Sequence, residues 1–127
     1  RVITHYNRKH AMYTLTHEGD KIGTTRLERG DPSVHAVSGE FVNVGGAGAL
    51  AGWIKSIGGQ VDDGVVFVAL NDDFELLDQE DKPIRFTEAS LIAIPADDEA
   101  YLDVTGISAE DYKAYFAGHI AAMDDNS

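Results

Sequence analysis

Short stretches in which apolar and polar residues alternate recur along the whole chain, and this two-residue period is typical of strands with one buried face. The stretches are rich in β-branched and aromatic residues and are separated by Gly, Asp and Pro, which favour turns. We predict about five to eight short strands among them. The candidate segments are residues 12–17, 22–27, 34–37, 40–44, 65–70, 74–77, 84–86, 91–94 and 101–104.

Most neighbouring segments are joined by short polar connections, so we expect antiparallel hairpins. The predicted pairs are 12–17 with 22–27, 34–37 with 40–44, 74–77 with 84–86, and 91–94 with 101–104. The remaining segment, 65–70, is an unbroken apolar run. Such a run predicts a strand that is buried on both faces at the centre of its sheet.

Two other segments show the three- and four-residue apolar spacing of a helix. This spacing predicts helices at about 46–57 and 109–122. Gly58 and Gly59 follow the first segment and would end it, as glycines commonly do. Ser108 precedes the second segment as a candidate N-cap. Both helices have one apolar face, so both are expected to pack on the sheet.

The composition fits an ordinary folded domain. The chain has 127 residues, of which 43% are hydrophobic and 25% are charged, so we predict a single α+β domain over residues 1–127 with a largely antiparallel sheet and two packing helices. Residues 1–10 and 124–127 are expected to be flexible. The chain contains no cysteine, which excludes disulfides and thiolate zinc sites and fits the cytoplasm. No apolar run is long enough for a membrane helix.

Charge is distributed very unevenly along the chain. Residues 61–127 contain seventeen Asp and Glu against three Lys and Arg, whereas residues 1–60 contain five acidic and seven basic residues. The negative electrostatic field of such an excess of acidic residues attracts cationic proteins and repels nucleic acids and anionic membranes. We therefore expect a basic protein partner, and neither nucleic acid nor membrane. The acids predicted to bind it are Asp72, Asp73, Glu75, Asp97, Asp98 and Glu99.

The excess charge has one other explanation, adaptation to a salt-rich environment. In that case acidic residues would coat every face of the molecule evenly, whereas a docking site would concentrate them on one face. The sequence alone leaves both open.

A glycine-rich segment offers an alternative function. Gly46-x-Gly48-x-x-Ala51 lies between a predicted strand and a predicted helix, and it resembles the dinucleotide-binding fingerprint. The resemblance implies a phosphate at the helix N-terminus, bound by Gly46 and Gly48, with Asp72 as the acid that binds the ribose. The surrounding elements favour antiparallel hairpins over βαβ units. We therefore prefer a structural role, in which the glycines allow a tight turn and close packing of the helix backbone at Gly48.

Candidate catalytic groups are few. None of the five histidines has the spacing of a helical metal site, and no serine lies in a Gly-x-Ser-x-Gly elbow. His17, next to Glu18 and close to Asp20, could act as an acid or base, which makes an acid–base enzyme a third hypothesis. We predict no catalytic residue, no cofactor and no metal ligand.

Taken together, these patterns favour a binding protein over an enzyme. The most concrete form of this prediction is a cytoplasmic immunity or inhibitor protein that covers the basic active site of a nuclease-like toxin. A small acidic domain suits this role because charge complementarity speeds the capture of a cationic partner.

Overall fold

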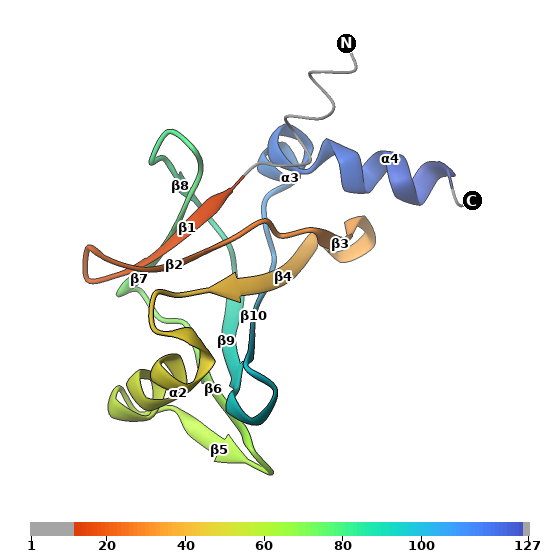
Figure 1. Cartoon of the computed structure of the whole chain (residues 1–127). Coiled ribbons are helices and arrows are strands. Elements are labelled where there is room, and N and C mark those ends of the chain that lie inside the picture. Colours follow the sequence, from red (N-terminus) through yellow and green to blue (C-terminus); the bar gives the residue numbers. More distant parts are fainter. Residues whose placement is uncertain (1–11, 126–127) are drawn as a thin grey trace.

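The computed structural model describes residues 12–125 and confirms an α+β fold with an antiparallel sheet (Figure 1). Every strand pairs antiparallel with its neighbours, in the order β5-β6-β9-β10-β4-β2-β1-β7-β8, with β3 paired to β4. The ten strands exceed the five to eight predicted. They are β1 (Tyr13–His17), β2 (Asp20–Thr25), β3 (Arg29–Asp31), β4 (Ala36–Val42), β5 (Gln60–Asp62), β6 (Val65–Ala69), β7 (Phe74–Leu77), β8 (Pro83–Ile84), β9 (Glu88–Ile94) and β10 (Glu99–Thr105).

Three of the four predicted hairpins are confirmed. They are β1 with β2, β7 with β8, and β9 with β10. Short 3-10 turns, η1 (Pro32–Val34) and η2 (Pro95–Asp97), precede β4 and β10.

The predicted hairpin of 34–37 with 40–44 is wrong, because Val34 lies in η1 and most of the other residues belong to one continuous strand, β4. Its first part pairs with β10 and its last two residues pair with β2, so β4 joins the two parts of the sheet. Gly23 of β2 allows this close crossing, since a Cβ at Gly23 would overlap the Val42 carbonyl oxygen and the Phe41 ring. Ser38 and Gly39, which would have formed the turn between these two segments, are therefore extended backbone.

The prediction that segment 65–70 is central and buried on both faces is also wrong. β6 lies between the edge strand β5 and β9. Val66 is buried, but Phe67 is only half-buried and Ala69 is exposed. One face of β6 lies under a helix, and apolar residues on the other, uncovered face complete the unbroken run.

The first predicted helix is confirmed as α2 (Gly46–Ser56). Its buried side chains, Ala47, Leu50, Ala51 and Ile54, face the inner side of β6, β9 and β10. That side carries Val66, Leu91, Ala93, Ala100 and Leu102 of the hydrophobic core. Figure 1 shows α2 lying on one side of these strands, and among residues 12–125 it is the helix that packs extensively against them.

The second predicted helix is divided in two. α3 (Ala109–Tyr115) ends at Phe116, and α4 (Ala117–Asp125) continues at an angle toward β3 (Figure 1). Phe116 is 4% exposed and stays in the core, while Gly118, a poor helix former, begins the next turn. Ser108 caps α3 as predicted, accepting a hydrogen bond from the Asp111 amide. α4 reaches Asp125, within a tail predicted to be flexible, whereas residues 1–10 and 126–127 lie outside the described residues.

The structure corrects the role predicted for Gly48. A Cβ at Gly48 would meet no atom within 4 Å, whereas Gly46 has a φ of +82° that L-residues rarely adopt. We expect Gly48→Ala to stabilise the protein by about 0.5–1 kcal/mol through lower backbone entropy in the unfolded chain. Gly46→Ala should instead destabilise it by about 1–2 kcal/mol. Urea melts of the two variants measure both effects, and a destabilised Gly48→Ala variant would restore the close-packing interpretation.

Candidate functional site

The side of the sheet opposite α2 carries a row of directly paired residues on five adjacent strands. From β5 to β4 the row is Gln60, Phe67, Ile92, Tyr101 and Glu40. Phe67, Ile92 and Tyr101 are half-buried, and the two end residues are exposed. On β6, β9, β10 and β4 these positions alternate with core residues, so the row points away from the core.

Acidic residues border this apolar row. Glu99 pairs with the half-buried Ile94, and Asp103 occupies the β10 position two residues beyond Tyr101. We call the surface formed by Phe67, Ile92, Ile94, Tyr101, Glu40, Glu99 and Asp103 the acidic sheet face. None of its four apolar residues packs against the hydrophobic core, and among residues 12–125 no helix packs extensively on this side (Figure 1).

Tyr101 lies in a negative field at the centre of this surface. Its hydroxyl donates a hydrogen bond to Glu99 at 2.9 Å. This bond, followed by loss of solvent and by the negative charges of Glu99 and Glu40, raises the pKa of Tyr101 above its ordinary value. The Arg29 guanidinium carbon lies 5.5 Å from the centre of the Tyr101 ring and lowers the pKa by a smaller amount. The ring already accepts one guanidinium group within an acidic environment.

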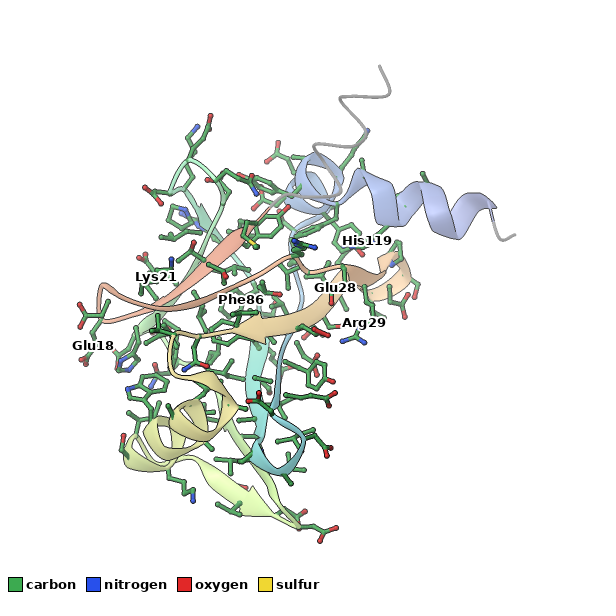
Figure 2. The ribbon with its side chains drawn as sticks, in the orientation of Figure 1. Glu18, Lys21, Glu28, Arg29, Phe86 and His119 are labelled. Carbon is green, nitrogen blue, oxygen red and sulfur yellow. The ribbon has the colours of Figure 1, made fainter. Side chains whose placement is uncertain are left out.

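A hollow of about 370 Å³ adjoins the acidic sheet face between β3, β4 and β10. Its charged lining residues are Arg29, Asp31 and Asp103. Figure 2 shows Arg29 on this side of β4. The lining of the hollow therefore combines two carboxylates with one guanidinium group.

The structure distributes the six predicted partner-binding acids over two regions. Asp97, Asp98 and Glu99 lie at the β9–β10 turn, and of these Glu99 belongs to the acidic sheet face. Asp72, Asp73 and Glu75 lie around the start of β7, where Phe74 packs against Trp53 of α2.

The glycine-rich turn already holds a carboxylate where the fingerprint would place a phosphate. Asp98 Oδ1 accepts a hydrogen bond of 3.3 Å from the Ala47 amide at the N-terminus of α2. The adjoining pocket of about 200 Å³ is lined by Glu40, Asp98 and Glu99, and Asp72 is not part of it. Three carboxylates repel phosphate, and the strands beside the turn are antiparallel, so this geometry speaks against nucleotide binding through Gly46 and Gly48.

His17 belongs to a cluster of side chains that lies away from the acidic sheet face. Its ring centre is 4.6 Å from that of Phe74 and 5.2 Å from that of Trp53. His17, Glu18 and Asp73 bring ligand atoms within 4.8 Å of one another. Figure 2 shows Glu18 at the tip of the β1–β2 hairpin, far from Arg29. The sequence placed His17 beside Glu18 but assigned Asp73 only to the partner-binding acids, because it is strand pairing between β1 and β7 that brings Asp73 next to His17.

Several residues of the acidic sheet face were not predicted as site residues. They are Glu40, Phe67, Ile92, Ile94, Tyr101 and Asp103. The predicted hairpin of 91–94 with 101–104 contained a usable signal, since alternation places Ile92 and Tyr101 on the side away from Leu91 and Leu102. The contributions of β4 and β6 depend on pairing over long sequence distances.

Comparison with protein-family models, curated proteins and solved structures found no match. Among residues 12–125, no helix is both long enough and apolar enough to cross a membrane. Function is therefore inferred from the geometry and charge of the chain itself.

Proposed function

We propose that the protein is a small acidic binding domain that captures a basic protein on the acidic sheet face. The observation that carries the proposal is the row of Phe67, Ile92 and Tyr101 on an uncovered side of the sheet, bordered by Glu40, Glu99 and Asp103. An apolar centre with a charged rim is the usual composition of a protein interface. The acidic rim selects a partner with Lys and Arg around its own apolar patch.

In its most concrete form, the proposal makes the protein a cytoplasmic immunity or inhibitor protein for a nuclease-like toxin. Nuclease active sites are basic because they bind phosphates. A surface that combines carboxylates with a half-buried tyrosine matches such a site in charge, and the hollow beside Asp31 and Asp103 would receive a protruding Lys or Arg. The same charge disfavours binding to nucleic acid.

The location of the surface can be tested with a hexa-arginine peptide. In an NMR titration at low salt, we expect the largest amide shifts on β9, β10 and β4, around Ile92, Tyr101 and Glu40. The shifts should shrink when salt is raised from about 20 to 200 mM, because screening becomes strong near 0.1 M. Equal shifts at every acidic turn would instead indicate a uniform solubilising charge.

A charge-matched pair of variants tests the function itself. The first neutralises Glu40, Glu99 and Asp103, and the second neutralises Asp20, Asp81 and Glu110, which are also exposed. With a basic partner captured from cell extract by the wild-type protein, the first variant should associate about tenfold more slowly, because steering depends on local charge. The second should retain nearly the wild-type rate in surface plasmon resonance. Equal slowing by both variants, or a rate independent of salt, would contradict the proposal.

A further inference from the structure

We propose that His17, Glu18 and Asp73 form a binding site for a divalent cation from the end of the first transition series, such as Zn²⁺, Ni²⁺ or Cu²⁺. Each residue offers one ligand atom, and these atoms lie within 4.8 Å of one another. Two ligands bound at about 2.0–2.2 Å in the tetrahedral geometry of zinc lie about 3.3–3.6 Å apart. An atom pair at the 4.8 Å limit would therefore have to approach by about 1.2–1.5 Å, which rotation of the exposed Glu18 and Asp73 side chains can supply.

The backbone brings the three residues together before any ion binds. His17 pairs with Phe74 in the β1–β7 ladder, which places the Asp73 side chain next to the β1–β2 turn. The Glu18 amide donates a 2.7 Å hydrogen bond to the Asp73 carbonyl oxygen. The two acidic residues are thus held side by side although 55 positions separate them in the sequence.

Aromatic packing orients the third ligand. The His17 ring meets the Trp53 ring nearly edge-on, with an interplanar angle of 82°, and lies tilted against Phe74 at 56°. His17 is half-buried, whereas Glu18 and Asp73 are exposed. A fixed imidazole lowers the entropy lost on binding a metal, because fewer side-chain rotations have to be stopped.

The ligand set indicates the class of metal. One imidazole and two carboxylates suit zinc and its neighbours, and water would fill the remaining coordination positions. Ca²⁺ and Mg²⁺ prefer sites made of oxygen ligands alone. Since the ligands come from the end of β1, the β1–β2 turn and the β6–β7 connection, a bound ion would link the β1–β2 hairpin to that connection. The site lies away from the acidic sheet face (Figure 2), so this proposal does not depend on the proposed function.

Trp53 provides a direct readout, because it is the only tryptophan in the chain and its ring centre lies 5.2 Å from that of His17. Cu²⁺ or Ni²⁺ bound to His17 should quench Trp53 fluorescence, and the quenching should saturate at one ion per protein. Zn²⁺ should compete and reverse it, and calorimetry should give the same stoichiometry for Zn²⁺ alone.

Variants decide whether these residues hold the ion. We expect His17→Gln to weaken Zn²⁺ binding at least tenfold, and Asp73→Asn and Glu18→Gln to weaken it several-fold. Asp20→Asn, in the same hairpin but outside the cluster, and His35→Gln should leave binding unchanged. If His17→Gln fails to fold, the two exposed carboxylate variants carry the test. Quenching that never saturates, or Zn²⁺ binding that survives both Asp73→Asn and Glu18→Gln, would overturn the proposal.

Discussion

Replacement of Phe116 by alanine is expected to destabilise the protein by about 3–5 kcal/mol, the usual cost of removing a fully buried aromatic ring. Phe116 is 4% exposed and stands at the junction of α3 and α4. Its ring centre lies 5.5 Å from that of Tyr13 on β1 and 5.4 Å from that of Tyr112 on α3. The same ring stacks on His119 of α4, with an interplanar angle of 17°. Alanine would therefore leave a cavity among three elements.

A substitution on the exposed side of the same helix provides the control. Lys113 is exposed, so Lys113→Ala should stay within about 0.5 kcal/mol of the wild-type stability. Urea denaturation followed by circular dichroism measures both variants. Similar losses for the two would mean that α3 does not pack on the sheet through its Phe116 side.

Local sequence patterns were sufficient to predict much of this fold. The segment 91–94 and its partner 101–104 alternate cleanly on either side of a polar turn, and they form β9 and β10 with Leu91 opposite Leu102. α2 was predicted because its apolar positions repeat at helical spacing over its full length. In both cases the residues that determine the element are close together in the sequence.

Features that depend on contacts between residues far apart in the sequence could not be predicted from local patterns. The apolar run of β6 has the composition of a doubly buried strand, yet only tertiary packing determines that α2 covers a single side of it. β4 contains a Ser-Gly pair typical of a turn, but Ser38 and Gly39 pair directly with β10, and the end of the strand pairs with β2, so the backbone stays extended. At Phe116 the helix is interrupted although the apolar periodicity continues.

The candidate sites also combine features that the sequence shows directly with features that only strand pairing creates. The acidic excess was evident from composition. The hydrogen bond that Asp98, one of the acids predicted to bind a partner, accepts from the Ala47 amide at the start of α2 could not be read from the sequence, because the two residues are 51 positions apart. The open apolar row could be found only from the pairing of strands that are distant in sequence. The same is true of Asp73, which joins His17 and Glu18 through the β1–β7 pairing.

The second largest expected effect on the free energy of unfolding comes from a buried hydrogen bond to a charged group. This bond joins α3 to the β7–β8 turn. Asp78 is 6% exposed. Its Oδ2 accepts a 2.7 Å hydrogen bond from the Tyr115 hydroxyl, and its Oδ1 accepts bonds from the backbone amides of Glu80 and Lys82. Because a hydrogen bond to a charged group contributes about 1.5–3 kcal/mol, Tyr115→Phe should destabilise the protein by about that amount at neutral pH.

The effect of Tyr115→Phe at low pH follows from the pKa of Asp78. Burial raises this pKa, but the Tyr115 hydroxyl, the two backbone amides and the charge of Lys82 together lower it below the ordinary 3.8. A carboxyl group whose pKa is lower in the folded state stabilises the fold above its unfolded pKa. That stabilisation is lost as the pH falls below 3.8 through the folded value. The difference in stability between the wild-type protein and Tyr115→Phe should therefore shrink in acid.

The effect of Tyr115→Phe at high pH follows from the pKa of Tyr115 itself. The hydrogen bond to Asp78, then burial, then the charges of Asp78 and Asp111 raise the pKa of Tyr115 from 10.0 to about 12. A group with a raised folded pKa contributes its full stability below its unfolded pKa, here 10, and loses it as the pH rises toward 12. The difference between the wild-type protein and Tyr115→Phe should accordingly be largest between about pH 4 and pH 10 and should shrink on both sides.

Urea melts across this pH range measure the profile, with Tyr101→Phe as the matched control. Tyr101 also donates a hydrogen bond to a carboxylate, Glu99, but both groups lie at the solvent-facing surface of the sheet, where water replaces a lost bond at little cost. Tyr101→Phe should therefore change stability little at any pH. Since phenylalanine keeps the ring, a difference between the wild-type protein and Tyr115→Phe that stays constant from acid to alkali would show that the Tyr115 hydroxyl stabilises the fold by some means other than its bond to the ionised Asp78 carboxylate.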